Sequence, residues 1–139
     1  MEEMGIDPRR DTRLRTLIIG VRNPQFRRTA PPHRTDAGRQ GLQLLRNVRM
    51  CGPGVAFECP EQNGLHIWED YYIVEIVDPQ TLEPVPDGEV GELVLTTINR
   101  EAMPLLRYRT RDLTRILPGE CPCGRHHKRL DRMKDEATI

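Results

Sequence analysis

Six short strand-like segments, several of them bounded by turn or loop residues, limit most strongly how this chain can fold. They lie at residues 55–57, 65–68, 71–77, 91–98, 105–111 and 113–117. Runs of this length between turns such as Gly52-Pro53-Gly54 and Pro86-Asp87-Gly88 are typical of β-strands. A last stretch, residues 127–133, is compatible with a strand or a helix. The pattern predicts a mainly antiparallel β unit of about 80 residues, near the lower size limit for a self-sufficient core.

The stretch M-P-L-L-R-Y-R-T-R-D, residues 103–112, combines an alternating pattern with a terminal carboxylate. Alternation predicts a half-buried strand with one face of Leu106, Tyr108 and Thr110 and an opposite face of Arg107, Arg109 and Arg111. Asp112 follows at the mouth of a loop or a new strand. A carboxylate there can accept hydrogen bonds from two neighbouring hydroxyls, as on a ribose. Spacing alone favours the simpler interpretation, a strand with a solvated arginine face and a capping aspartate.

Charge and hydropathy restrict the possible partners. The chain has 21 basic and 21 acidic residues, so no global field attracts nucleic acid or an anionic membrane. No apolar run approaches the ~20 residues of a membrane span, and the first residues contain no apolar signal core. We therefore expect a cytoplasmic protein with no membrane and no nucleic-acid partner.

The balanced total hides an arginine-rich segment. Between Thr12 and Arg49 every basic residue except His33 is an arginine, and Asp36 is the one acid. Such a segment can be a basic arm that binds nucleic acid, or a solvated segment without stable structure. Because residues 21–49 lack a sustained strand or helix period, we expect them to be poorly ordered, with at most weak helix near residues 40–47.

Four residues form a candidate metal site. Cys59 and His66 flank one loop, and Cys121 and Cys123 occupy the tight turn C-P-C-G. Three thiols and an imidazole are a ligand set that structural zinc prefers, and cysteines in a cytosolic chain favour metal over disulfides. The alternative is that these are ordinary thiols in loops.

The remaining chemically active side chains receive structural assignments. Cys51 is expected in the core, His126 and His127 are reserve metal ligands, and His33 is expected to be solvated. Trp68, Tyr71 and Tyr72 are expected in the core, because no basic groove accompanies them to make a base-stacking platform. Glu89 and Glu92 are expected to be solvated rather than an acid/base pair.

The stretch at 103–112 resembles the Y-R-T-x-D segment of adenylate-forming acyl-CoA ligases. The preceding G-E-V-G-E-L-V-L-T-T is similar to the strand that leads into that segment, and C-G-P-G-V-A-F-E-C-P-E-Q-N-G-L-H-I-W-E-D resembles the phenylacetate-CoA ligase branch. The resemblance runs over residues 50–134 and again over residues 1–20.

This resemblance implies an enzyme that uses ATP with Mg²⁺ and CoA to convert an aryl acid such as phenylacetate to an acyl-adenylate and then a thioester. It implies that Asp112 holds the ribose hydroxyls of ATP and AMP, and that Pro53 and Gly54 line the acyl pocket. Some relatives carry a similar Cys and His set, which favours structural zinc at Cys59, His66, Cys121 and Cys123.

The resemblance also predicts a domain organisation. Residues 1–20, with a strand at 14–19, correspond to a remnant of the ligase α/β domain, in which the neighbours of that strand are missing. Residues 50–134 correspond to the small β-barrel-like subdomain of a multidomain α/β ligase, and residues 135–139 to a truncated tail.

The sequence lacks parts that the family uses. It contains no phosphate-binding loop, and no C-terminal domain with a catalytic lysine. Where the family carries an aromatic motif, this chain reads G-L-Q-L-L-R-N-V-R-M, which a shifted reading of suitable codons turns into K-A-Y-N-Y-Y-G-M-S. We therefore hypothesise that residues 21–49 are translated out of frame, and we predict an inactive fragment. The alternative function is a small zinc-stabilised binding module with a basic N-terminal arm.

Overall fold

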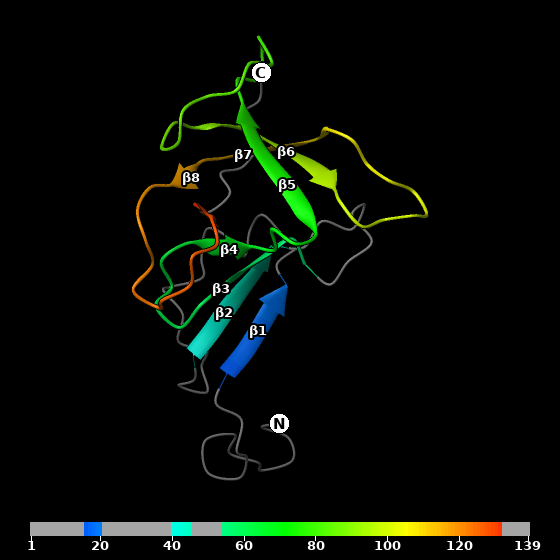
Figure 1. Ribbon diagram of the computed structural model, residues 1–139. Coiled ribbons are helices and arrows are strands. Elements are labelled where there is room, and N and C mark those ends of the chain that lie inside the picture. Colours follow the sequence, from blue (N-terminus) through cyan, green and yellow to red (C-terminus); the bar gives the residue numbers. More distant parts are fainter. Residues whose placement is uncertain (1–15, 21–39, 46–53, 132–139) are drawn as a thin grey trace, which may run out of the picture.

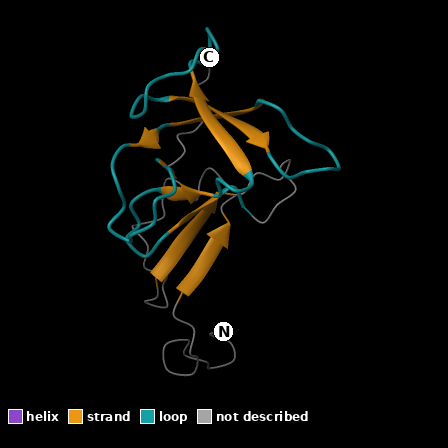
Figure 2. Ribbon diagram, viewed as in Figure 1, coloured by secondary structure: helices purple, strands orange, loops and turns teal. Residues whose placement is uncertain are grey.

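The computed structural model describes residues 16–20, 40–45 and 54–131, and the statements below concern these residues (Figure 1). This part of the chain forms nine strands and no helix (Figure 2). The strands are β1 Thr16–Gly20, β2 Gln40–Leu45, β3 Ala56–Glu58, β4 Leu65–Ile67, β5 Tyr72–Val77, β6 Gly91–Thr97, β7 Tyr108–Thr114, β8 Ile116–Leu117 and β9 Arg129–Leu130.

The strands make two sheets. The larger sheet has the order β1-β2-β3-β4-β9-β8 and the smaller one the order β5-β6-β7. Only β1 and β2 pair in parallel, and every other pairing in the two sheets is antiparallel. The chain passes from the smaller sheet to the larger one at Arg115, where Asp131 N–H donates to the Arg115 carbonyl at 2.9 Å.

One apolar core joins the two sheets. The larger sheet contributes Ala56, Leu65, Ile67, Ile116 and Leu130, each at most 7% exposed. The smaller sheet contributes Tyr72, Ile76, Leu93 and Leu95, each at most 5% exposed. Burial of apolar surface contributes about 25 cal/mol per Å², so this shared core is the main force that holds the sheets together.

Two glycines allow close approaches that a side chain would prevent. Gly64, in the turn between β3 and β4, has a φ of +85°, and a Cβ there would lie 2.5 Å from Leu117 Cδ1. A Cβ on Gly91, the first residue of β6, would lie 2.5 Å from the Val77 carbonyl oxygen. Only glycine fits the first position without strain, because φ is in the left-handed region.

The predicted fold class is confirmed: the described part is mainly antiparallel β. The Pro86-Asp87-Gly88 turn is also present, since Glu89 N–H donates to the Pro86 carbonyl at 3.1 Å and Gly88 has a φ of +97°. The ambiguous stretch at 127–133 contains strand β9. Strand β7 begins at Tyr108, three residues later than predicted, and extends to Thr114.

Two expectations for the first part of the chain are wrong. Residues 40–47 were expected to be at most weakly helical, whereas Gln40–Leu45 form β2. The strand predicted at 14–19 appears as β1 at Thr16–Gly20, but its neighbour is present, because β1 pairs with β2 from Thr16↔Gln40 to Gly20↔Leu44. Pairing with a distant strand supplies backbone hydrogen bonds that local periodicity does not reveal.

Other expectations concern residues outside the described part. They include the order of residues 21–39 and 46–49, the placement of Cys51, Pro53 and His33, and the tail at 135–139. Among the described residues, no helix is long and apolar enough to cross a membrane.

Candidate functional site

The four predicted metal ligands lie together at one end of the larger sheet. Cys59 directly follows β3, and His66 is the central residue of β4, which pairs with β3 in the register Phe57↔His66. Cys121 and Cys123 lie in the loop between β8 and β9, and the β4–β9 pairing brings this loop to the β3–β4 turn. Residues 62 positions apart in the sequence thereby become neighbours.

Two of the donor-atom separations match those of a tetrahedral zinc site. All four lie within 4.8 Å of one another, with 3.7 Å between the sulfurs of Cys59 and Cys121 and 3.5 Å between Cys123 Sγ and His66 Nε2. In a tetrahedral site with Zn–S of about 2.3 Å and Zn–N of about 2.0–2.1 Å, two sulfurs lie about 3.8 Å apart and a sulfur lies about 3.5 Å from a nitrogen. The group can therefore accept a tetrahedral ion with little rearrangement.

Burial and neighbouring charges set the protonation of the group. Burial, followed by the charges of Arg125 and Arg129, lowers the pKa of the His66 imidazole, which favours the neutral, metal-binding form. Burial raises the pKa of the Cys59 thiol. Burial opposes ionisation of Cys123 as well, but hydrogen bonds with Arg125, Cys121 and Cys59 outweigh it and lower its pKa to about 7.

A buried arginine joins the two ligand-bearing loops. Arg129 is 3% exposed, and its guanidinium donates to the carbonyls of Asn63 at 2.9 Å, Pro118 at 3.2 Å and Gly119 at 2.8 Å. A buried charge is tolerated because each of these bonds is charge-assisted. Nothing in the local sequence pattern separates Arg129 from the exposed arginines, so its role could not be predicted.

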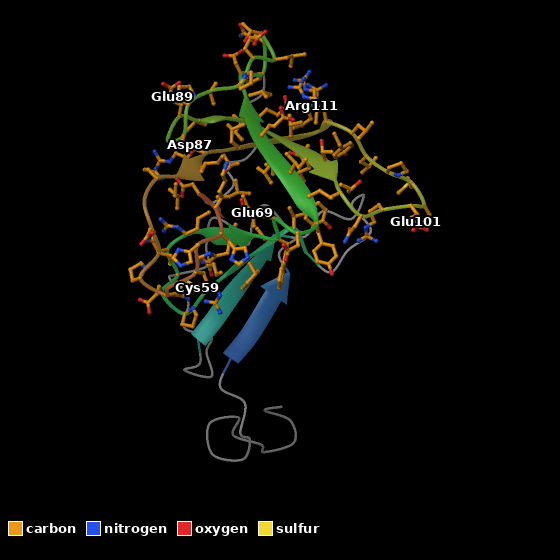
Figure 3. All side chains as sticks on the ribbon, viewed as in Figure 1. Cys59, Glu69, Asp87, Glu89, Glu101 and Arg111 are labelled. Atoms are coloured by element: carbon orange, nitrogen blue, oxygen red, sulfur yellow. The ribbon has the colours of Figure 1, made fainter. Side chains whose placement is uncertain are left out.

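Asp112, the predicted ribose ligand, lies on β7 outside the Cys/His group. Figure 3 shows its neighbour Arg111 on the smaller sheet and Cys59 in the other half of the molecule. The backbone N–H of Asp112 donates to Thr110 Oγ1 at 3.1 Å, and the Thr110 hydroxyl donates to the Leu93 carbonyl at 2.9 Å. The position of Asp112 is thus tied to the central strand β6.

The arginine face of β7 is not simply solvated. Glu92, expected to be solvated, is 2% exposed and forms an ion pair with Arg109. Glu92 Oε1 also accepts from the backbone N–H of Arg111 at 3.2 Å. Arg111 has a φ of +67°, and the pairing of β6 with β7 shifts register between Glu92 and Val94. The extra residues of this bulge break the predicted alternation. As a result, Arg109 and Arg111 both lie beside the buried carboxylate of Glu92.

The ionisation of Glu92 follows from this arrangement. Burial alone would raise the pKa of its carboxyl. Hydrogen bonds from Arg109 and Arg111, together with their charges, outweigh burial and hold the pKa below its usual value. Glu92 is therefore an ionised structural residue, which sequence spacing did not identify.

The aromatic residues differ in burial. Tyr72 is in the core as predicted, whereas the prediction is wrong for Trp68 and Tyr71, which are 41% and 47% exposed.

The reserve ligands His126 and His127 are exposed and lie outside the metal group. His126 Nδ1 instead lies 3.8 Å from Glu120 Oε1.

Comparisons with known proteins agree on one family. The chain is 47% identical over 140 residues to the phenylacetate-coenzyme A ligase of Aromatoleum evansii, a match that covers 100% of this chain and 31% of the relative. It is 58% identical over 94 residues to the phenylacetate-coenzyme A ligase of Thermus thermophilus, covering 67% of this chain and 21% of the relative.

The fold is similar to that of another CoA ligase. A crystal structure of 2-hydroxyisobutyryl-CoA ligase in the postadenylation state superposes with a TM-score of 0.74 at 26% identity, covering 92% of this chain and 27% of that one. The comparison with protein-family models finds no match. The chain spans less than a third of the length of the curated relatives described above. It is therefore homologous to a segment of the phenylacetate-coenzyme A ligases, within the adenylate-forming acyl-CoA ligases.

Proposed function

We propose that this chain is part of an ATP-dependent CoA ligase for an aryl acid such as phenylacetate. The observation that carries the proposal is 47% identity to a phenylacetate-coenzyme A ligase along the whole chain. Such an enzyme joins the acid to AMP as an acyl-adenylate and then transfers the acyl group to CoA as a thioester. ATP with Mg²⁺, CoA and the acid are its small-molecule partners, and its expected location is the cytoplasm.

Asp112 is the residue proposed to contact the nucleotide, by accepting hydrogen bonds from the ribose hydroxyls. Its neighbours support the assignment, because Thr110 binds its backbone and the Glu92 carboxylate binds the backbone of Arg111. A carboxylate on a fixed backbone loses little entropy when it accepts two hydroxyls. The chain offers no phosphate-binding loop, so the triphosphate depends on the rest of a ligase.

The isolated chain is expected to show no ligase turnover. A millimolar complex needs a net binding free energy of ~4 kcal/mol. Two charge-assisted hydrogen bonds, each worth about 1.5–3 kcal/mol, do not leave that much once the cost of ordering the bound groups is subtracted. The assay combines the chain with phenylacetate, ATP and CoA and measures the thioester by chromatography. Thioester above a no-protein control would contradict this expectation.

A chimera tests the ligase proposal directly. Residues 54–131 of this chain would replace the homologous segment of the Thermus thermophilus ligase, and turnover would be measured. The proposal expects an active chimera that loses activity with Asp112→Asn but retains it with the conservative surface change Asp87→Asn. A folded but inactive chimera would refute it.

A second chimera tests the reading-frame hypothesis. It would also carry residues 21–53, and activity in this chimera would contradict out-of-frame translation. Sequencing the DNA across residues 21–49 gives an independent answer, because codons that cannot encode the shifted motif exclude the hypothesis. The same DNA read tests whether a phosphate loop and a lysine-bearing domain are encoded nearby.

We also propose that Cys59, His66, Cys121 and Cys123 hold a structural zinc ion. The clustering of their donor atoms within 4.8 Å supports this assignment. With four protein ligands no position remains open for substrate, so the ion would stabilise the fold rather than act in catalysis. Elemental analysis should give one zinc per chain, and Co²⁺ substitution should give the intense visible bands of a tetrahedral thiolate site. The same cluster favours the alternative of a zinc-stabilised binding module, whose basic arm lies largely outside the described residues.

A further inference from the structure

Two sulfurs of the Cys/His group lie close enough to bond covalently after a small movement. The sulfurs of Cys59 and Cys121 are 3.7 Å apart, and both side chains are buried. The sulfurs of a disulfide are about 2.05 Å apart, so this pair needs to approach by only about 1.7 Å. The three described cysteines are free thiols. The pair is therefore arranged for oxidation as well as for metal binding.

The other contacts of the group favour this pair of sulfurs. Cys123 Sγ faces His66 Nε2 at 3.5 Å, which leaves the other two sulfurs facing each other. A bond between Cys121 and Cys123 would close a ring over the single residue Pro122, whose φ is fixed by its own ring. A bond between Cys59 and Cys121 instead joins the β3–β4 loop to the β8–β9 loop across 62 positions.

These two loops are also joined by contacts that need no metal ion. The guanidinium of Arg129 donates to the carbonyl of Asn63 in the β3–β4 loop and to that of Gly119 in the β8–β9 loop. Asn63 is four residues after Cys59, and Gly119 is two residues before Cys121. The pairing of β4 with β9 holds the same loops together. Departure of a metal ion would therefore leave the two sulfurs close to each other.

We propose that Cys59 and Cys121 are a site of reversible disulfide formation by hydrogen peroxide, and that this modification releases a metal ion from the group. The group opens to solvent at Cys123, which is partly exposed, so a small neutral oxidant has a path to the buried sulfurs. The release of zinc rests on the proposed role of the group. The disulfide itself rests on the positions of the sulfurs.

The chemistry balances with peroxide as the oxidant. One thiolate attacks a peroxide oxygen, so that an S–O bond forms, the O–O bond breaks and hydroxide leaves. The second thiolate attacks the oxidised sulfur, so that an S–S bond forms, the S–O bond breaks and a second hydroxide leaves. The two sulfurs lose two electrons in total, and these reduce the peroxide to the two hydroxide ions. Only Cys123 and His66 then remain as ligands, which is too few for a structural zinc site.

The disulfide would replace the metal ion as the cross-link between the two loops. A bond that closes a loop of 62 positions restricts the unfolded chain, which favours the folded state. Disulfides in a reducing compartment are usually transient and redox-sensing, so a cellular thiol would reverse the bond. The chain would thus hold zinc only while reduced and remain folded in both states.

Peptide mapping after oxidation gives the primary test. The full chain would be loaded with zinc, freed of reductant and treated with hydrogen peroxide, after which remaining thiols would be alkylated and peptides identified by mass spectrometry. The expected product carries a bond between residues 59 and 121, with Cys51 and Cys123 alkylated. A chromogenic chelator should show loss of the zinc in step with this bond. Dithiothreitol with added zinc should restore both the thiols and the bound metal.

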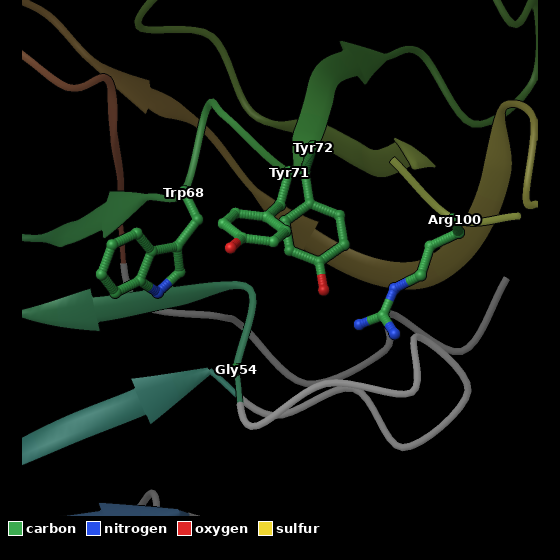
Figure 4. A pocket seen from close by; sticks show the side chains of 5 residues that line it. All are labelled: Gly54, Trp68, Tyr71, Tyr72 and Arg100. Carbon is green, nitrogen blue, oxygen red and sulfur yellow. The ribbon is translucent and has the colours of Figure 1, made fainter. Parts of the chain in front are cut away.

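Trp68 distinguishes oxidation of a folded chain from unfolding. It is the only tryptophan, it packs on Phe57 with a ring-centroid distance of 4.8 Å, and it lines a half-open cavity with Tyr71 and Arg100 (Figure 4). Phe57 lies opposite His66 in the pairing of β3 with β4, so the indole reports on the strands beside the metal group. Its emission should keep the folded spectrum after oxidation and shift only in denaturant. The oxidised chain should also melt above the reduced, zinc-free chain.

Three variants provide controls. Cys51→Ser keeps all four members of the group and should oxidise and lose zinc as the unmodified chain does. Cys123→Ser keeps both partners and should still form the bond between residues 59 and 121. Cys59→Ser should form no bond at residue 121 with the β3–β4 loop.

The proposal is wrong if the folded, oxidised chain contains no bond between residues 59 and 121, or if Cys123 takes the place of either partner. Retention of zinc after the bond has formed would contradict the proposed release. A chain that holds no zinc before oxidation would contradict the zinc assignment alone, because the peptide map still decides whether the disulfide forms. The ligase chimera is a separate experiment, so its result is independent of this one.

Discussion

Removing metal from the Cys/His group should lower the melting temperature by about 15 °C or more. The site is preformed, with the Cys59 and Cys121 sulfurs 3.7 Å apart, near the edge length of a zinc–sulfur tetrahedron. Zinc peptides that must also fold gain about 10–16 kcal/mol on binding, which corresponds to dissociation constants from tens of nanomolar to picomolar. Free zinc at about a thousand times such a constant stabilises the fold by about 4 kcal/mol.

The conversion to temperature follows from the size of the domain. One kcal/mol shifts the melting temperature of a 60–100-residue domain by about 4–8 °C, so loss of about 4 kcal/mol gives 15 °C or more. Calorimetry would compare the zinc-loaded chain, the chain with a chelator, and the chain with zinc restored. Cys59→Ser and Cys123→Ser should melt near the chelated protein and respond weakly to chelator. His126→Asn, which changes an exposed histidine outside the group, should behave as the unmodified chain. Equal melting temperatures with and without chelator, in protein that holds no zinc, would refute the reasoning.

Three further predictions concern the described fold. Arg129→Met removes three charge-assisted hydrogen bonds to backbone carbonyls and should cost about 3 kcal/mol of unfolding free energy by urea denaturation, together with about 10–100-fold weaker zinc binding by competition with a chelating dye; an unchanged zinc affinity would contradict its role in joining the loops. Glu92→Gln should cost about 1.5–3 kcal/mol at pH 7, and because the folded pKa of Glu92 is depressed, the difference from the unmodified chain should shrink as pH falls below about 4.5; a difference that stays constant after NMR titration shows the Glu92 carboxyl protonated would exclude the ionised carboxylate as its source. Gly64→Ala should destabilise the chain by more than 1 kcal/mol, because φ is positive and the added methyl meets Leu117, whereas Gly88→Ala tests φ alone, since open space surrounds that position.

The strands of the smaller sheet could be predicted because local pattern and tertiary role coincide there. Strand β6 buries all of its residues except the partly buried Thr96, and its near-continuous apolar run marks a central strand. Strand β2 could not be predicted, because its pairing with β1 joins segments whose separation no local window spans. The same applies to β9, where two residues become a strand only because β4 and β8 lie on either side.

The metal group could be predicted from residue type, since thiols and an imidazole near turns carry a chemical signal. The electrostatic residues could not. Glu92 and Glu89 look alike in the sequence, yet Glu92 is buried against two arginines while Glu89 is exposed. The difference arises from the bulge in β7, which brings two arginines to one carboxylate. The alternating sequence pattern of residues 103–112 does not reveal this bulge.

The order in which the larger sheet closes has a consequence for synthesis on the ribosome. The β3–β4 hairpin with Cys59 and His66 is complete at Ile67, 54 positions before Cys121, and at about 5–20 residues per second these positions take roughly 3–11 s. During this interval β4 presents an unpaired edge, which is open to pairing with other nascent chains. Only two of the four metal ligands exist at that time, so a captured ion would be held weakly. Once residues 121–130 have been made, β9 covers this edge, and Cys121 and Cys123 join the first two ligands. This half of the molecule then becomes paired at the same stage of synthesis at which its proposed zinc site becomes complete.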